Sequence, residues 1–207
     1  MNFLAHLYLS GQCDSVKLGN FIGDFVKGNK HENFPSGIQR GIILHRHIDH
    51  YTDIHPLVSK SSQRLRYGYN RYSTVVVDMF YDHFLAKNWN NYHTLTLREY
   101  TNSIHHLLIR NYGWLPQPVK RFLPFLMASR RLESYASING LQRALEIMSR
   151  RTSLPNKTQW AIHCLETNYY DFEQDFTNFF PEVIHYVETQ HKVSVEAPDD
   201  LRLNVKK

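Results

Sequence analysis

Helical periodicity runs through almost the whole chain and limits its fold more than any other feature. Apolar residues recur three and four positions apart, as they do in helices that bury one face. The best strand candidate is the β-branched run at residues 73–77, but it leads directly into residues 78–85, which repeat like a helix. We therefore expect an all-α fold. The expected helices span residues 14–30, 37–66, 71–89, 95–112, 117–131, 137–151 and 157–188.

The length of the chain, 207 residues, fits one helical bundle with a substantial core. Short stretches containing Gly, Pro and Asn separate the expected helices, and each is short enough to connect helices that pack side by side. The helical pattern ends near residue 189. We expect a single helical domain over residues 1–188 and a C-terminal tail over residues 189–207.

The sequence argues against several classes of protein. Its two cysteines, Cys13 and Cys164, are far apart, which suggests neither a disulfide framework nor a thiolate zinc site. The first residues are apolar for only a short stretch that contains His6, so we expect no signal peptide, no membrane span and a cytoplasmic location. The glycine-rich motifs of P-loop and Rossmann proteins and the G-x-S-x-G motif of hydrolases are absent.

The formal net charge of +5 predicts an acidic partner. That partner could be nucleic acid, a nucleotide, an anionic membrane or an acidic protein, and charge alone does not choose among them. The aromatic segments lack an RNA-recognition pattern, which makes nucleic acid the weaker option. The thirteen histidines are more than usual, and histidine both binds metals and titrates near neutral pH.

A stripe along segment 37–66 begins apolar and becomes polar at His45 and Asp49. Residues four apart share one face of a helix, so this imidazole and this carboxylate can reach the same point, as metal ligands do. An isolated pair of this kind is more often an ordinary contact on a solvated surface. A metal site is favoured here because other segments repeat the pattern.

Acids and histidines also lie among apolar residues elsewhere in the chain. Asp78 and Asp82 fall on one face of segment 71–89, and a buried carboxylate requires a cation, a histidine or a metal. His83 follows Asp82 directly, and its side chain would point about 100° away on a helix. Asp24 and His6 are likewise surrounded by apolar residues.

Mixed aspartate and histidine ligands without cysteine are typical of catalytic metal sites that keep open positions. Such ligands suit Mn²⁺, Fe²⁺, Zn²⁺ or Mg²⁺. Arg46 follows His45 in the sequence and would stand at the rim of this site, where its guanidinium could hold a phosphate. The sequence therefore predicts a catalytic metal site beside a phosphate-binding arginine.

Four groups of residues form motifs with a specific order and spacing. They are Met1-Asn2-Phe3-Leu4-Ala5-His6-Leu7, Gly19-Asn20 with Asp24-Phe25-Val26-Lys27-Gly28, His45-Arg46-His47-Ile48-Asp49 with Thr52-Asp53, and Asp78-Met79-Phe80-Tyr81-Asp82-His83-Phe84-Leu85 with Trp89. Together they closely resemble the motifs of the acyl carrier protein phosphodiesterases. The likeness continues more weakly to Phe180-Pro181, so it covers nearly all of the chain before the expected tail.

The resemblance implies an all-α fold distantly related to the HD-domain phosphohydrolases. It also implies a hydrolase that removes 4′-phosphopantetheine from holo-acyl carrier protein with the help of a metal, most often Mn²⁺. Acyl carrier protein is small, helical and strongly acidic, which agrees with the positive net charge of this chain. The adjacent pair Asp82-His83 departs from the usual HD pattern, in which histidine precedes aspartate.

The matching motif positions define the expected site. We expect Asp24, Arg46 and His83 to be catalytic, with Arg46 and His83 steadying the phosphate. From their spacing, the expected metal ligands are His6, Asp24, His45, Asp49, Asp78 and Asp82.

Two other functions stay open at this point. A phosphohydrolase of the HD type could use the same metal site on a nucleotide or another small phosphoester. Alternatively, a non-catalytic helical module could bind an acidic partner through its arginines. The oligomeric state also stays open.

Overall fold

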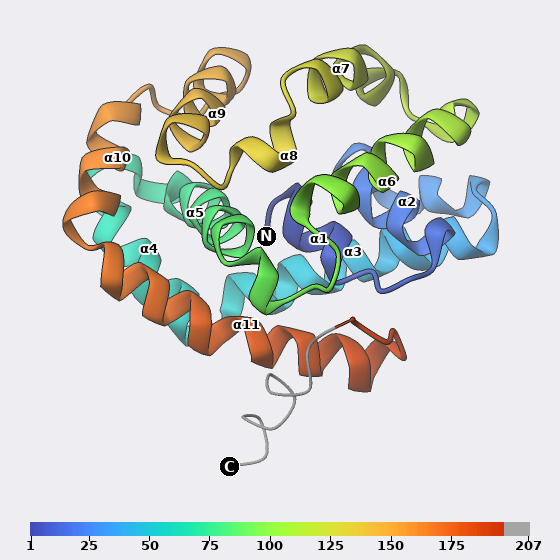
Figure 1. The fold of residues 1–207 in the computed structure, drawn as a ribbon, viewed down its shortest axis with the longest axis horizontal. Helices are drawn as coiled ribbons and strands as arrows, with labels where there is room; N and C mark the ends of the chain where they lie inside the picture. Colours follow the sequence, from blue (N-terminus) through green and yellow to red (C-terminus); the bar gives the residue numbers. More distant parts are fainter. Residues whose placement is uncertain (197–207) are drawn as a thin grey trace.

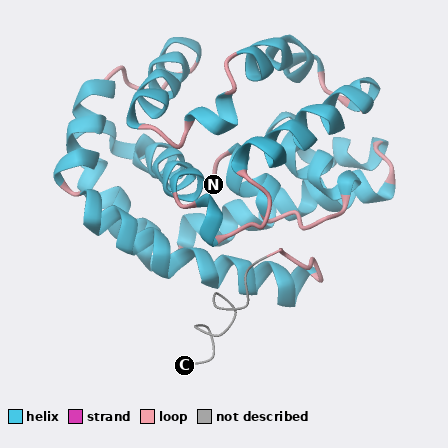
Figure 2. Cartoon of the chain, in the orientation of Figure 1, coloured by secondary structure: helices cyan, strands magenta, loops and turns pink. Residues whose placement is uncertain are grey.

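The structure is a computed structural model that describes residues 1–196. Every regular element in this part of the chain is a helix, which confirms the expected all-α fold (Figures 1 and 2). Short 3₁₀ turns connect the α-helices at η1 (Gly23–Phe25), η2 (Gly28–Asn33), η3 (Asn70–Tyr72), η4 (Trp89–Asn91) and η5 (Tyr112–Trp114). The α-helices are α1 (Phe3–Tyr8), α2 (Asp14–Ile22), α3 (Ser36–Ile54), α4 (Pro56–Tyr69), α5 (Ser73–Lys87), α6 (Leu97–Arg110), α7 (Gln117–Ala128), α8 (Arg131–Ser134), α9 (Ile138–Arg151), α10 (Thr158–Thr167) and α11 (Tyr169–His191).

The β-branched run at residues 73–77 is helical, as expected, and begins α5. The expected helix over residues 37–66 is wrong as a single element, because the chain breaks between α3 and α4. Pro56 disfavours helical backbone at the residue before it, and His55 is extended, with φ −74° and ψ 132°. Pro56 then occupies the first turn of α4, where its missing N–H costs nothing.

Three other expected helices are also divided. The segment at 14–30 is helical only to Ile22 and continues as η1 and η2, and the segment at 117–131 is divided between α7 and α8. The segment at 157–188 breaks at Asn168, whose side-chain amide donates to the Cys164 carbonyl at the end of α10.

The C-terminal end of α11 extends to His191. Val193 and Val195 follow it and are buried against the helical core. The remainder of the expected tail, residues 197–207, lies outside the described residues.

The N-terminal helix α1 lies near the middle of the molecule and packs against both α2 and α5 (Figure 1). Helix α2 runs along α3 at very short range, because glycines stand where the two helices meet. A Cβ atom at Gly19 would overlap the Ile38 carbonyl, and one at Gly41 would overlap the Val16 carbonyl. Helix α11 packs across α4, α3 and α5 through buried phenylalanines. None of the helices within residues 1–196 is long and apolar enough to cross a lipid bilayer.

Candidate metal centre

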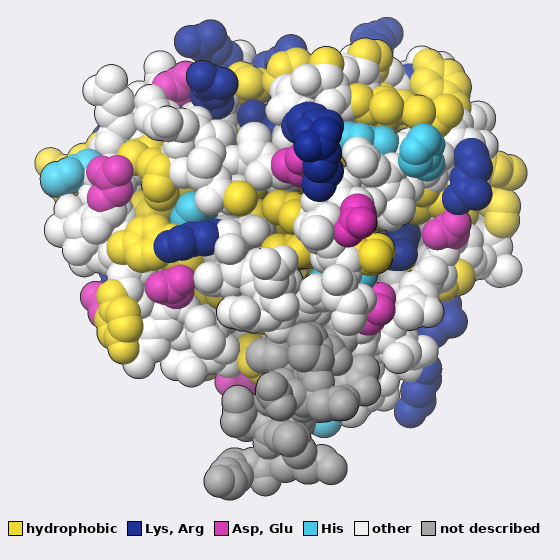
Figure 3. Space-filling model, viewed as in Figure 1, with side chains coloured by type: hydrophobic (Ala, Val, Ile, Leu, Met, Phe, Trp, Pro, Cys, Tyr) yellow, Lys and Arg dark blue, Asp and Glu magenta, His cyan; other side chains and the backbone are white. Residues whose placement is uncertain are grey.

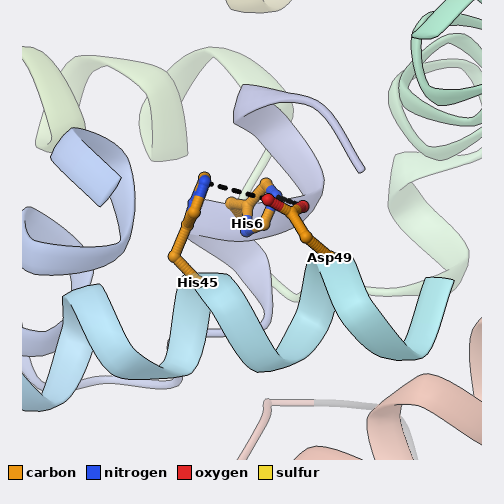
Figure 4. Close-up of side chains that lie close together, drawn as sticks. All are labelled: His6, His45 and Asp49. Carbon is orange, nitrogen blue, oxygen red and sulfur yellow. Dashed lines mark hydrogen bonds and ion pairs between the residues drawn. The ribbon is translucent and has the colours of Figure 1, made fainter. Parts of the chain in front are cut away.

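Helices α1 and α3 bring His6, His45 and Asp49 together (Figure 4). The Nε2 atom of His6 lies 3.0 Å from Oδ1 of Asp49, and Nε2 of His45 lies 3.2 Å from Oδ2 of the same carboxylate. The two imidazole rings stack, with centroids 4.1 Å apart and planes 24° from parallel. One ligand atom from each residue falls within 4.8 Å of the others. Two imidazoles and one carboxylate thus converge on one point.

The local sequence explains why these side chains meet. His45 and Asp49 are one helical turn apart on α3, so they share a face. Gly23 directly follows α2 beside them, and a Cβ atom at that position would overlap the His45 ring. The absence of a Cβ atom at Gly23 therefore leaves room for the imidazole of His45, and α1 supplies the second imidazole, that of His6.

Asn20 on α2 connects the two histidines from the side opposite Asp49. Its Oδ1 lies 2.8 Å from Nδ1 of His6 and 3.2 Å from Nδ1 of His45, and its side chain is fully buried. Asn20 was absent from the expected site residues, because an amide is a less common metal ligand than carboxylate or imidazole. The available signal was a polar residue between Gly19 and Phe21 in a motif otherwise rich in apolar residues.

Asp24 reaches the same group of residues from η1. Its Oδ1 lies 3.5 Å from Nε2 of His45, although the carboxylate is largely exposed. The hydrogen bonds of Arg46 do not involve His6, His45 or Asp49. Its Nη2 instead donates to the carbonyl oxygens of Val26 and Gly28, at 2.9 and 2.7 Å. In the structure, Arg46 therefore holds the loop that carries Asp24.

The charges of these groups depend strongly on one another. Burial disfavours the charged form of His45, but the carboxylates of Asp24 and Asp49 outweigh burial and raise the pKa of His45 to about 9. Burial and the neighbouring His45 lower the pKa of His6 to about 4. Burial opposes ionisation of Asp49, yet the two histidines next to its carboxylate hold its pKa well below the usual range. The metal-free protein thus holds a charged His45 between two carboxylates.

A cavity of about 310 Å³ opens beside this group. The amino nitrogen of Met1 lies at its edge, 3.1 Å from Oδ1 of Asp78 and 3.6 Å from Oδ1 of Asp49. Burial raises the pKa of Asp78, although this amino group lowers it. Four carboxylates line the cavity, those of Asp24, Asp49, Asp53 and Asp78, together with apolar side chains that include Met79 and Met148.

Asp82 is fully buried on α5, and its carboxylate faces the first turn of α1. Its two oxygens accept hydrogen bonds from the backbone N–H groups of Leu4 and Ala5, at 2.8 and 3.1 Å. Burial raises the pKa of Asp82 to about 7, against the lowering effect of these hydrogen bonds. Both oxygens are thus engaged in holding the helix that carries His6.

His83 is also buried, and both of its ring nitrogens have partners. Nδ1 lies 2.7 Å from the Tyr135 carbonyl oxygen, and Nε2 lies 2.9 Å from the Tyr169 hydroxyl. Lys87 donates to the same hydroxyl. These contacts connect α5 to α11 and to the residue after α8, so the structure does not bring His83 into contact with His6, His45 or Asp49.

The donor set at His6, His45 and Asp49 fits a divalent transition ion. Borderline nitrogen and hard oxygen donors suit Mn²⁺, Fe²⁺ or Zn²⁺, and two histidines with one carboxylate leave positions open for other ligands. Nε2 of His45 is buried and has no partner in hydrogen-bond geometry within residues 1–196, although Asp49 is only 3.2 Å away. A buried polar atom without such a partner is costly, and a bound cation would remove that cost.

Comparison with known proteins identifies relatives over almost the full length of the chain. The family model for acyl carrier protein phosphodiesterase matches residues 1–183, which include every expected site residue. A relative of that name from Yersinia pestis is 32% identical over 193 residues, covering 93% of this chain and 99% of the relative. Another, from Photorhabdus laumondii, is 30% identical over 191 residues, covering 92% and 96%. No solved structure shows a significant match.

Proposed function

The chain belongs to the acyl carrier protein phosphodiesterase family, and we propose that it hydrolyses holo-acyl carrier protein in a metal-dependent reaction. The bond broken would be the phosphodiester between 4′-phosphopantetheine and a serine of the carrier protein, which would leave the apo form. Relatives that carry the name of this activity align with almost the whole chain. A distant relation to HD-domain phosphohydrolases is part of the proposal and rests on the motifs alone.

The observation that carries the metal dependence is the convergence of His6, His45 and Asp49. We expect these three residues to be the ligands of the cation, with Asp24 close enough to His45 to act as a fourth. Mn²⁺ is the first candidate, and Mg²⁺, Fe²⁺ and Zn²⁺ are alternatives. When bound, such a cation polarises a phosphoryl oxygen and lowers the pKa of water.

The charge of the cavity also supports the metal. Four carboxylates line about 310 Å³ of space next to His45, and a phosphodiester is itself an anion. Two like charges about 4 Å apart repel by several kcal/mol when water is partly excluded. A phosphodiester bound there therefore requires positive charge nearby, and a cation held by His6, His45 and Asp49 would supply it, because Asp49 also lines the cavity. The carboxylates of Asp24 and Asp49 would hold that charge in place.

Acyl carrier protein is strongly acidic, so the net charge of +5 on this chain agrees with it as the partner. On the face shown in Figure 3, Lys and Arg side chains are spread widely and alternate with acidic side chains. Attraction over the whole molecule, rather than one basic patch on this face, would then bring the acidic partner to the protein.

Mass spectrometry of the carrier protein tests the proposal. Incubation of the protein with Mn²⁺ and holo-acyl carrier protein should convert the holo form to the apo form and release phosphopantetheine. Parallel incubations with cyclic and linear nucleotide phosphodiesters should show no comparable turnover. Hydrolysis of a nucleotide without conversion of the carrier protein would contradict the substrate, and binding of the carrier protein without any hydrolysis would favour a non-catalytic module.

A further inference from the structure

Among the described residues, Asn20 alone has a side chain within hydrogen-bond distance of Nδ1 of both His6 and His45. We propose, resting on the metal-dependent function above, that Asn20 is a positioning residue that keeps a proton on Nδ1 of both rings. Nε2 of His6 is then free to bind a divalent cation together with Asp49, and Nε2 of His45 becomes free when the cation displaces the second proton of that ring. Asn20 does not touch the substrate or the cation in this account.

The orientation of the Asn20 amide follows from its other neighbours. The Ser10 hydroxyl donates its single proton to the His6 carbonyl oxygen at 2.7 Å. Both the Ser10 Oγ atom and the His6 carbonyl are therefore acceptors towards Asn20, at 2.8 and 2.9 Å. Only the NH₂ group of the amide can donate to them. The carbonyl oxygen of the amide must consequently face the two imidazole rings.

This orientation decides which ring nitrogens carry protons. Oδ1 of Asn20 has no proton to give, so Nδ1 of His6 and Nδ1 of His45 must each donate to it. A carbonyl oxygen has two lone pairs and can accept both bonds. In a neutral ring with a proton on Nδ1, Nε2 carries a lone pair, which is the form of histidine that binds a metal.

The remaining contact is then unfavourable without a cation. Nε2 of His6 and Oδ1 of Asp49 lie 3.0 Å apart, and with the His6 proton on Nδ1 both atoms are acceptors. Two acceptors at this distance repel unless a proton or a metal ion lies between them. A divalent cation held by His6, His45 and Asp49 would remove this repulsion.

The surroundings leave Asn20 no other arrangement. Its side chain is fully buried, and Ser10 beside it is 1% exposed, so water does not compete for these hydrogen bonds. The tight contact of α2 with α3 at Gly19 and Gly41 fixes the position of Asn20 along α3, and so its distance from His45. The amide thus acts from the interior of the protein, and the ring atoms that face Asp49 stay available.

Nitrogen NMR of the metal-free protein labelled with ¹⁵N-histidine tests the proton positions directly. We expect Nδ1 of His6 and His45 to be protonated, and addition of Zn²⁺, which is diamagnetic, should shift Nε2 of both rings. In Asn20→Leu the donor–acceptor pairing is lost, so His6 should change to the Nε2–H form and Mn²⁺ should bind about 10- to 100-fold more weakly.

Two further variants separate this effect from a loss of folding. Asn168→Leu makes the same change at the partly buried asparagine between α10 and α11 and should leave Mn²⁺ binding and both His spectra unchanged. Ser10→Ala keeps Asn20 but removes the hydroxyl that orients its amide, so it should weaken Mn²⁺ binding less than Asn20→Leu does.

A proton on Nε2 of neutral His6 in the wild-type protein would overturn the inference. So would unchanged Mn²⁺ affinity in a folded Asn20→Leu variant. Protonated Nδ1 atoms with tight Zn²⁺ binding, but no conversion of holo-acyl carrier protein, would instead support the role of Asn20 and contradict the proposed substrate.

Discussion

His6 on α1 and Asp49 on α3 place a ring nitrogen and a carboxylate oxygen 3.0 Å apart, across a contact between two helices that are distant in sequence. The second oxygen of Asp49 lies 3.2 Å from Nε2 of His45. Within residues 1–196, Asp49 is therefore the one residue whose charged group contacts both imidazoles. Its removal should affect the proposed metal centre more than any other single change of an acid.

Asp49→Asn should abolish tight metal binding. The substitution keeps the size of the side chain but removes the negative charge that balances the cation, so the activity should fall by about 100-fold or more. Metal analysis after dialysis and the carrier-protein mass assay measure the two effects. Asp14→Asn, the same change at an exposed residue paired with Arg110, is the matched control and should behave like the wild-type protein.

Part of this site could be predicted from the sequence. The spacing of His45 and Asp49 is a property of one helix, so periodicity was sufficient to place them together. The approach of His6 depends on how α1 packs, and only the motif likeness indicated it. The sequence did not distinguish Asp49 from Asp82, because the partners of Asp82 are backbone N–H groups, which every residue except proline carries.

Asp82→Asn tests whether this residue supports α1 or binds the metal. One N–H group of α1 would lose its acceptor and face the new NH₂ group, so we expect a loss of about 1–3 kcal/mol in the free energy of unfolding. Metal affinity should fall less than in Asp49→Asn. Urea denaturation and Mn²⁺ titration measure both. Wild-type stability combined with complete loss of Mn²⁺ binding would identify Asp82 as a ligand instead.

His83→Gln addresses the expected catalytic role of this histidine. Its ring contacts the Tyr135 carbonyl and the Tyr169 hydroxyl, so the substitution should lower the free energy of unfolding by about 1–3 kcal/mol. Activity per folded molecule should change less than about threefold. A fall of 100-fold in kcat with an unchanged melting temperature would show that His83 acts on the substrate after all.

The stability of the metal-free protein should fall as the pH rises from about 6.5 to about 9. His45 has its pKa raised from 6.5 to about 9 in the folded state, so its charged form stabilises folding fully below pH 6.5. That contribution is lost as the pH rises through 9. After allowance for the exposure of Asp24, the loss should be about 2 kcal/mol.

Denaturation at several pH values measures this loss, and His45→Gln should make the profile flatter over the same range. Metal binding should show the opposite trend, because the cation displaces the His45 proton. The affinity for Mn²⁺ should therefore increase with pH up to about 9. An affinity independent of pH between 6.5 and 9 would mean that His45 is not a ligand.

The all-α fold was predictable because periodicity of three and four residues is a local property. The boundaries were less so. Pro56 was a visible signal for the break between α3 and α4, whereas Asn168 ends α10 through a hydrogen bond to Cys164 that composition does not reveal. Asn20 is not among the expected site residues for a related reason. Its proposed role depends on His6, Ser10 and His45, which only the folded chain brings together around it.

Stepwise addition of Mn²⁺ to the metal-free protein, with bound Mn²⁺ followed by electron paramagnetic resonance and apo-acyl carrier protein followed by mass spectrometry in the same samples, tests the central claim most directly. Activity should be absent without metal and should rise in proportion to the Mn²⁺ bound by the wild-type protein. Asp49→Asn should show neither signal. Full conversion of the carrier protein by metal-free protein, or equal activity in Asp49→Asn, would contradict a metal-dependent reaction at His6, His45 and Asp49.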